Sequence, residues 1–206
     1  MSRPEQEIEV KFILNDLPGL AARVQALGGR VIAPRVHELN LRFDTPDLAL
    51  TREHRVLRLR QDASAVMTYK GPADLGQGVS ARQEIEFQVG DFQAARHLLE
   101  ALGYRVSIWY EKYRTTYELG EVHVTLDEMP FGSFAEIEGP DAPAIRTAAA
   151  ALKLDWEARC TTSYLALFDQ LRAARGLEAH NLSFEELQGA STAPEDFGLR
   201  YADQEI

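Results

Sequence analysis

The sequence is poor in cysteine and has no long apolar run. Its single cysteine, Cys160, excludes an intramolecular disulfide, fits a reducing cytoplasm and is expected to be a buried structural thiol. No apolar stretch approaches the roughly 20 residues of a membrane-spanning helix. The first ten residues, MSRPEQEIEV, lack the apolar core of a signal peptide. We therefore expect a cytoplasmic protein without a membrane partner.

Positive charge is scarce as well. The chain has 22 Lys and Arg against 32 Asp and Glu, for a net charge of −10. A field of this sign repels nucleic acid and anionic membranes, so we expect no nucleic-acid partner. If the protein binds an anion, it must gather its basic side chains locally. With 206 residues, 45% of them hydrophobic, the chain is long enough for one globular domain with a substantial core.

Alternation of apolar and polar residues dominates the first two-thirds of the chain and predicts β-strands. The expected strands cover residues 5–14, 30–44, 55–61, 65–70, 81–90, 104–118, 120–129 and 133–139. Helices are expected at 16–29 and 91–103, where Asp16 and Asp91 are suitable N-caps. The stretches 141–154 and 154–176 are also expected to be helical, and the second has an apolar stripe that should face the core.

The segment that contains the first strand and helix recurs later in the chain. EIEVKF…ALGGRV matches EIEFQV…ALGYRV, so that Glu7 aligns with Glu84 and Arg30 with Arg105. This repeat of strand, helix and strand predicts two similar halves related by a pseudo-twofold axis. The triplet E-I-E occurs a third time, at Glu136–Glu138. On a strand its two carboxylates point the same way about 7 Å apart, and they repel unless a cation lies between them.

Each of these strands has one apolar face and one charged face, and two folds accommodate this. In an open antiparallel sheet the charged face is solvated and carries cross-strand ion pairs. In a closed barrel, which has no exposed edges, helices cover the apolar outside and the charges line the lumen. We expect the second, an α+β fold: an eight-stranded antiparallel closed β-barrel, or tunnel, with helices packed outside. A lumen of both signs of charge suits a polyanion held with divalent cations.

The motifs resemble those of a known family. EIEVK is similar to the E-x-E-x-K signature of the CYTH proteins, or triphosphate tunnel metalloenzymes, which include class IV adenylyl cyclases, thiamine triphosphatases and inorganic triphosphatases. Further family motifs follow in order over residues 5–170: FDTPD (43–47), LRLR (57–60), TYKGP (68–72), RQEIEF (82–87), EKYR (111–114), the aspartate of TLDE (125–128) and GSFAEIEG (132–139). One such motif would be weak evidence, but the ordered set is specific.

The resemblance implies a tunnel that binds a triphosphate together with Mg²⁺ or Mn²⁺, and it implies roles by position. The implied metal ligands are Glu7, Glu9, Glu136, Glu138 and Asp127. The implied phosphate-binding residues are Lys11, Arg58, Arg60, Lys70, Arg82, Lys112 and Arg114. The implied catalytic residues are Glu7, Glu9, Lys11 and Glu84, the last of which would orient the attacking water. His123 is an alternative base, but a structural role is expected for it.

Three segments depart from the family pattern or leave alternatives open. Arg42 stands where many members have an aromatic residue before F-D-T, and it is either a cation at the tunnel mouth or a surface arginine. TSY (162–164) replaces the K-S-Y of some relatives, so a helix-borne lysine is missing. The loop GPADLGQGVS (71–80) lacks the ending of a P-loop and is either a lid or a plain connection.

Residues 1–176 are expected to form the tunnel domain, and 177–206 a polar extension that is draped over it or partly disordered. The favoured function is divalent-metal-dependent hydrolysis of a triphosphate group, in inorganic triphosphate, thiamine triphosphate or a nucleoside triphosphate. One alternative is a class IV adenylyl cyclase that converts ATP to cyclic AMP and pyrophosphate. Another is a non-catalytic module that binds polyphosphate or nucleotide. The expected partner is a small-molecule triphosphate, and a homodimer is left open.

Overall fold

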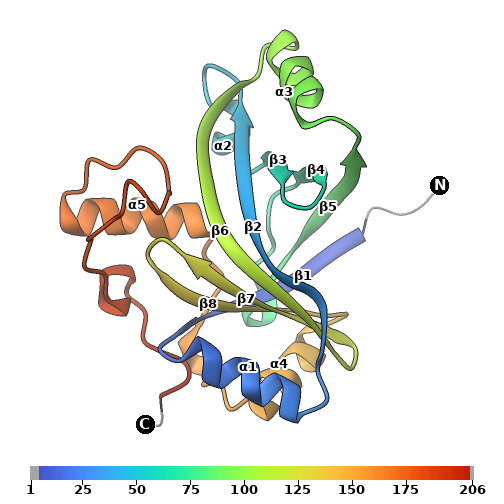
Figure 1. Cartoon of the computed structure of the whole chain (residues 1–206), viewed down its shortest axis with the longest axis vertical. Coiled ribbons are helices and arrows are strands. Elements are labelled where there is room, and N and C mark those ends of the chain that lie inside the picture. The colour runs from blue at the N-terminus through green and yellow to red at the C-terminus, as the bar shows by residue number, and fades with distance from the viewer. Residues whose placement is uncertain (1–4, 205–206) are drawn as a thin grey trace.

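The computed structural model describes residues 5–204, and its strands form one closed ring (Figure 1). All eight expected strands are present, with ends that differ from the expected ones by two residues or fewer. They are β1 (Glu5–Leu14), β2 (Arg30–Asp44), β3 (Val56–Gln61), β4 (Ala65–Lys70), β5 (Ser80–Val89), β6 (Arg105–Leu119), β7 (Val122–Met129) and β8 (Gly132–Glu138). A short strand that was not expected, β9 (Arg159–Cys160), pairs with β1.

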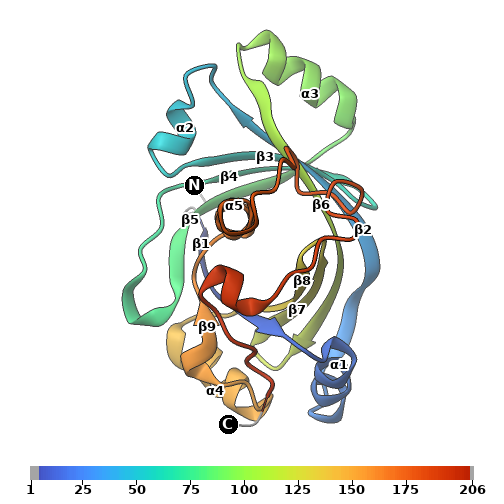
Figure 2. The same cartoon turned by 90° about the vertical axis from the view of Figure 1, so that its left-hand side faces the viewer.

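Strand β1 closes the ring because it pairs with two partners. Residues 5–9 of β1 pair with β5, and residues 9–14 pair with β8. The order around the ring is β1, β5, β4, β3, β2, β6, β7 and β8, and every pairing is antiparallel. Figure 2 shows this ring end-on. The expected closed antiparallel tunnel is confirmed.

The ring also confirms the internal repeat. Exchanging β1 with β5, β2 with β6, β3 with β7 and β4 with β8 maps the strand order onto itself. The two repeated strands pair with each other at β1–β5, and the two strands that follow them pair at β2–β6. The pseudo-twofold axis therefore passes between β1 and β5 on one wall of the ring and between β2 and β6 on the opposite wall.

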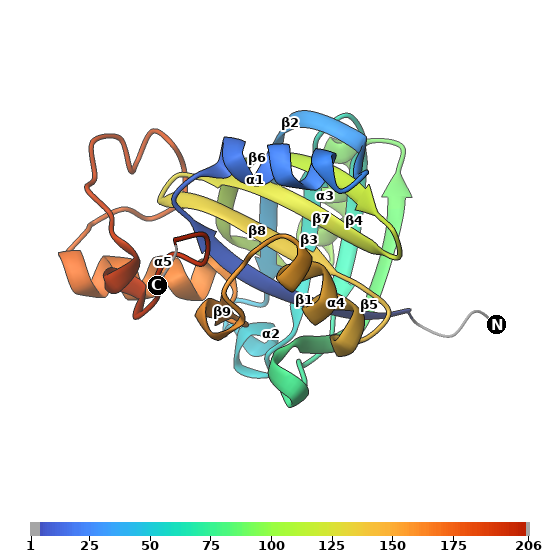
Figure 3. The same cartoon turned by 90° about the horizontal axis from the view of Figure 1, so that it is seen from below.

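The helices lie outside the ring. They are α1 (Leu17–Ala26), α2 (Ala49–Arg52), α3 (Phe92–Ala101), α4 (Ala142–Ala151) and α5 (Tyr164–Arg175). Helices α1 and α4 cover the outer face of β1, β7 and β8 (Figure 3), α3 packs near β3, and α5 lies in front of one opening of the ring (Figure 2). Within residues 5–204, none of these helices has the length and apolarity to cross a bilayer.

The apolar faces of the strands form the core beneath these helices. Val10 and Phe12 on β1 are 1% and 0% exposed and pack with Leu20 of α1 and Ile145 of α4. Each fully buried side chain of this size contributes about 1.5–3 kcal/mol. Because side chains alternate along a strand, burying Val10 and Phe12 outside the ring places Glu9 and Lys11 inside it.

The helix starts follow the expected caps. The side chain of Asp16 accepts a hydrogen bond from the backbone N–H of Gly19, and that of Asp91 accepts one from Ala94. These bonds satisfy N–H groups that a helix leaves free at its first turn. The helices end at glycines in equivalent places, Gly28 with φ 88° and Gly103 with φ 92°, where a left-handed backbone requires glycine.

The prediction of one continuous helix over residues 154–176 is wrong. The segment starts with a 3₁₀ turn at Trp156–Ala158, continues as β9 and becomes α-helical only at Tyr164. The break occurs because Ser163 acts as N-cap, with its Oγ accepting from the N–H of Ala166, while Cys160 pairs with β1. The apolar stripe is split accordingly: its helical part, Tyr164, Leu167, Phe168 and Leu171, is buried, as is the thiol of Cys160.

The polar tail packs against the ring. The backbone of Leu182 bonds to that of Trp109 and Glu111 on β6, and the N–H of Ala202 donates to Ile13 on β1. Leu182 is 0% exposed in a second core cluster with α5. The carboxylate of Asp203 accepts from the N–H groups of Asn15 and Asp16 at the start of α1. Residues 177–203 therefore lie draped over the domain.

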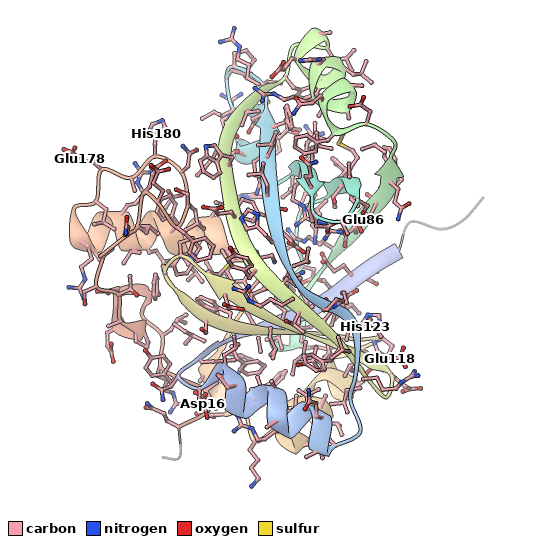
Figure 4. All side chains as sticks on the ribbon, viewed as in Figure 1. Asp16, Glu86, Glu118, His123, Glu178 and His180 are labelled. Atoms are coloured by element: carbon pink, nitrogen blue, oxygen red, sulfur yellow. The ribbon has the colours of Figure 1, made fainter. Side chains whose placement is uncertain are left out.

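We expect replacement of Leu182 by Ala to lower the free energy of unfolding by about 2–5 kcal/mol, because it leaves a cavity in a closed core. Urea titration followed by circular dichroism measures this. Glu178, which projects from the outer edge of the tail (Figure 4), supplies the matched control, since Glu178→Ala should change stability by less than about 0.5 kcal/mol. Equal effects of the two substitutions would mean that the tail does not contribute to the core.

Candidate functional site

The interior of the ring holds a cavity of about 1000 Å³. It is lined by every site residue expected from the sequence except Asp127. These residues are Glu7, Glu9, Lys11, Arg58, Arg60, Lys70, Arg82, Glu84, Lys112, Arg114, Glu136 and Glu138. Glu86 and His123, from β5 and β7, face the same cavity (Figure 4). The charged faces of the strands thus meet in one enclosed space, as the closed-barrel interpretation requires.

Lys11 lies between two carboxylates. Its Nζ is 2.5 Å from Glu9 on the same strand and 3.2 Å from Glu136, which faces it in the β1–β8 register. Burial opposes charge on both partners, but the opposite charges prevail. The pKa of Lys11 is therefore raised, and the pKa of Glu136, which also contacts Arg114, is held well below its usual range.

A second cluster joins β1, β4 and β5. Glu7 forms ion pairs with Lys70 and with the Nε of Arg82, the latter at 3.2 Å, while Lys70 also lies 3.4 Å from Glu84. Burial works against the charge of Glu7, yet Lys70 and Arg82 lower its pKa. For Glu84, burial and the neighbouring Glu7 outweigh Lys70 and raise the pKa to about 7.

Asp127 lies on the inner face of β7, opposite Arg114 in the strand register, where it is fully buried and orients the basic residues of β6. Its Oδ2 lies 3.0 Å from the Nζ of Lys112, and its Oδ1 accepts from the Nε of Arg114 at 2.6 Å. The hydroxyl of Tyr164, from the first turn of α5, donates to Oδ2 at 2.8 Å. Both carboxylate oxygens are therefore occupied, and a role of Asp127 as a metal ligand stays a prediction.

Arg58 and Arg60 extend into the lumen from β3. Arg58 donates to Thr68 at 3.2 Å and to the hydroxyl of Tyr110 at 3.4 Å, and it lies 3.6 Å from Glu86. Arg60 lies 3.1 Å from Asp62 and 3.8 Å from Glu86. Apart from Asp62, the carboxylates near these guanidinium groups, Glu38 and Glu86, lie 3.6–3.8 Å away and beyond hydrogen-bond distance, so donors of both arginines are available to an anion.

The residues on the inner face of β2 also belong to the site, although the sequence did not predict this. Glu38 is 2% exposed and lies within 4 Å of Arg60 and Lys112. Burial opposes its charge, but Lys112 and Arg114 lower its pKa to about 2. Arg42, left open as a tunnel-mouth or surface residue, lines the cavity. The signal was present, because residues 38, 40 and 42 alternate with apolar Leu39, Leu41 and Phe43.

Tyr110 and Tyr164 are also lumen residues that the sequence analysis did not assign to the site. Tyr110 is on the inner face of β6, and Tyr164 was expected only as part of a core stripe on a helix. The ammonium groups of Lys11 and Lys112 lie 5.5 and 5.4 Å from the centre of the Tyr164 ring. Cation–π attraction at this range helps to hold both lysines in place.

The carboxylates of β1 and β8 have the chemistry of a divalent-metal site, although they are not arranged as one. Among the described residues, no group of three or more His, Cys, Asp or Glu side chains is placed to hold a metal ion. Lys11 and Lys70 occupy the carboxylates of Glu9 and Glu7. Glu138 has no basic partner within 4 Å among residues 6–204, and burial with the charges of Glu7 and Glu9 raises its pKa to about 7. Oxygen ligands with unneutralised charge fit Mg²⁺ or Mn²⁺.

Fold and lumen together define a closed antiparallel tunnel that is lined by basic residues from six strands and by carboxylates of the neighbouring strands β1, β5 and β8. The CYTH domain model matches residues 5–159, so the chain belongs to the CYTH family. The family includes adenylyl cyclases and triphosphatases, which act on triphosphate groups.

Two curated relatives match by sequence. Adenylate cyclase CyaB of Aeromonas hydrophila is 32% identical over 136 residues, which are 64% of this chain and 67% of the relative. A putative adenylate cyclase of Methanocaldococcus jannaschii is 26% identical over 134 residues, which are 64% of this chain and 75% of the relative.

Solved structures share the fold. That of a putative adenylate cyclase from Vibrio parahaemolyticus has a TM-score of 0.72 and 23% identity, and the match covers 81% of this chain and 99% of that one. That of a putative adenylyl cyclase from Hippeastrum has a TM-score of 0.59 and 20% identity, with coverage of 79% and 95%.

We expect replacement of Glu138 by Gln to stabilise the metal-free protein at alkaline pH. The carboxyl group has a pKa of about 7 when folded and an ordinary value of 4.5. Between these values the unfolded chain binds fewer protons than the folded one, so stability falls as pH rises from about 4.5 to 7 and stays lowered above. The variant lacks this loss. In EDTA its Tm should exceed that of the wild type at pH 8 and equal it at pH 4.

Glu121→Gln, in the exposed turn between β6 and β7, is the control and should leave Tm unchanged at both pH values. A lower Tm of the Glu138 variant at pH 8 would contradict the repulsion, because it would mean that Glu138 makes a stabilising contact.

Proposed function

We propose that this protein is a divalent-metal-dependent phosphohydrolase that acts on a triphosphate group bound in the tunnel. The observation that carries the proposal is the convergence of seven expected phosphate-binding residues and the E-x-E carboxylates on one cavity. A triphosphate at neutral pH carries several negative charges, and charge-assisted bonds from Lys and Arg are the strong contacts for it.

The bases would bind substrate by exchanging partners. Lys11 and Arg114 now contact carboxylates, and phosphoryl oxygens that enter the tunnel would replace those contacts. The carboxylates released in this way, together with Glu138, which has no basic partner among the described residues, would then be free to hold the metal; they are Glu7, Glu9 and Glu136. A bound divalent cation supplies Lewis-acid neutralisation of charge on the phosphoryl oxygens.

Positioning is the main contribution that this site makes to phosphoryl transfer, since the reaction needs in-line geometry and neutralised oxygens more than covalent help. Arg58 on β3 and Arg114 on β6, the two strands that flank β2 in the ring, would hold oxygens of the transferred group. Glu84, whose carboxylate faces the cavity 3.4 Å from Lys70, would orient the attacking water.

Adenylyl cyclase activity is the second candidate, and the relative named Adenylate cyclase CyaB, at 32% identity, favours it. A cyclase must also hold adenine and activate the ribose 3′-hydroxyl. The two tyrosines of the lining, Tyr110 and Tyr164, are both hydrogen-bonded to charged residues, and the described residues place no Phe or Trp there. The name alone does not decide the reaction, because the Hippeastrum structure of the same fold is described as revealing a dominant triphosphatase activity.

A substrate panel tests the proposal. Purified protein is incubated with inorganic triphosphate, thiamine triphosphate and ATP, each with Mg²⁺ or Mn²⁺, and phosphate, pyrophosphate and cyclic AMP are measured. Release of phosphate without cyclic AMP supports the hydrolase. Cyclic AMP with an equal amount of pyrophosphate supports the cyclase instead, and binding without any product supports the non-catalytic module.

The metal ligands are tested by replacing Glu138 with Gln. Because Glu138 has no basic partner to lose among the described residues, the variant should fold. We expect it to need a roughly 10- to 100-fold higher metal concentration for half-maximal turnover, since one ligand is lost. Glu121→Gln should behave as the wild type. An unchanged metal requirement in the Glu138 variant would remove this residue from the ligand set.

A further inference from the structure

One lysine or arginine of the cavity lining differs from the others in having no acidic partner. Among residues 6–204, each of the other basic lining residues has a carboxylate within 4 Å, whereas the structure records neither a salt bridge nor a side-chain hydrogen bond for Arg42. Its Nε is buried without a partner. A guanidinium group remains charged at any physiological pH, so this charge is not neutralised within the described protein.

The surroundings of Arg42 add to its positive charge. It lies on β2 opposite Arg58 of β3 in the strand register. Burial and the like charges of Arg58 and Arg82 lower the pKa of Arg42, and they outweigh the opposing effects of Tyr110 and the more distant Asp44. Nearby Tyr110 accepts a bond from Arg58, so its oxygen is already engaged. Glu38 of the same strand lies near Arg60 and Lys112, so on this wall of the tunnel, among the described residues, Arg42 itself has donors without a matching carboxylate within 4 Å.

The opposite wall has the reverse imbalance. Strand β2 is four places from β1 in either direction around the ring, and β8 is next to β1. Glu138 on β8 lacks a basic partner within 4 Å among the described residues, and the nearby carboxylates of Glu7 and Glu9 repel its charge. The lumen is thus polarised across its width, from carboxylates at β1 and β8 to guanidinium groups at β2 and β3.

We propose that Arg42, together with Arg58, binds the terminal phosphoryl group of the substrate and thereby selects polyphosphates that have a free end. This inference rests on the proposed triphosphate-binding tunnel and deepens it. An unesterified terminal phosphoryl group carries up to two charges on three unshared oxygens, whereas an internal or esterified group carries one. The unpaired guanidinium group accordingly favours the terminal group most.

The unpaired charge of Arg42 should affect the stability of the free protein as well as its binding of substrate. A largely buried cation without an acidic partner destabilises the free protein, because it has lost part of its hydration and gained no opposite charge. Replacing Arg42 by an uncharged residue should therefore stabilise the free protein and weaken its complex with the substrate. A purely structural arginine would show the opposite sign, since its loss would lower the Tm.

The test measures Tm and binding in EDTA, where no metal-dependent turnover occurs, for the wild type, Arg42→Gln and Arg42→Lys. We expect Arg42→Gln to have a Tm equal to or above that of the wild type and to bind inorganic triphosphate about 10- to 100-fold more weakly in calorimetry, as for loss of a charge-assisted bond. Arg42→Lys, which keeps the charge, should recover part of the affinity. For diadenosine triphosphate, which is esterified at both ends, the affinity of Arg42→Gln should be less than about twofold below that of the wild type.

Arg30→Gln is the matched control. Arg30 is on the same strand, its side chain is 75% exposed, and it pairs with Glu118; neither residue lines the cavity. Equal triphosphate affinity of the wild type and Arg42→Gln, or a lower Tm of Arg42→Gln in EDTA, would overturn the assignment. Turnover with Mg²⁺ is measured separately. Wild-type protein that binds triphosphate but releases no product would refute the hydrolase, while the binding data would still test the role of Arg42.

Discussion

Closure of the ring by β1 is the constraint on which the rest of this structure depends. Because β1 pairs with β5 along one half and with β8 along the other, its inner residues meet side chains from both ends of the repeat. Lys11 thereby reaches Glu136, and Glu7 reaches Arg82. The same closure turns the apolar residues outward beneath α1 and α4. A charged lumen and an apolar outer core are two results of one pairing pattern.

Charges in such a lumen stabilise the free protein only in part. Most of them are paired, and the pairs recover much of the free energy lost when the side chains leave water. Glu138 and Arg42 are exceptions among the described residues, and they lie toward opposite walls. The tunnel therefore retains a dipole across its width that a metal and a phosphate chain can neutralise together. The groups expected to bind ligands most strongly are those that lack a partner of opposite charge in the free protein.

Much of the fold could be predicted from alternation, because a strand that is buried on one face and lines a lumen on the other shows its period directly. The repeat predicted the twofold symmetry, and Asp16 and Asp91 predicted the helix starts. The helix expected over 154–176 failed because an apolar spacing that suits a helix also suits a turn, a bridge to β1 and a later cap at Ser163.

The site was predicted less completely than the fold. Alternation identifies which residues share a face, but it contains no information on which strands are neighbours. That Asp127 contacts Tyr164, or that Arg42 faces Arg58 with no carboxylate of the described residues within 4 Å, depends on pairings between segments distant in the chain. Those pairings arise from tertiary packing, so they become visible only in three dimensions.

Ring closure also bears on how the chain is made. Strand β1 is synthesised well before its partners, since β5, β8 and β9 begin at residues 80, 132 and 159, and Asp203 of the tail bonds to the start of α1. During translation the hydrogen-bonding edges of β1 therefore stay unpaired until those partner strands have left the ribosome. Contacts so distant in sequence form slowly, and a waiting strand is a site for association with other chains. We therefore expect the ring to close only after β8 and β9 have been synthesised.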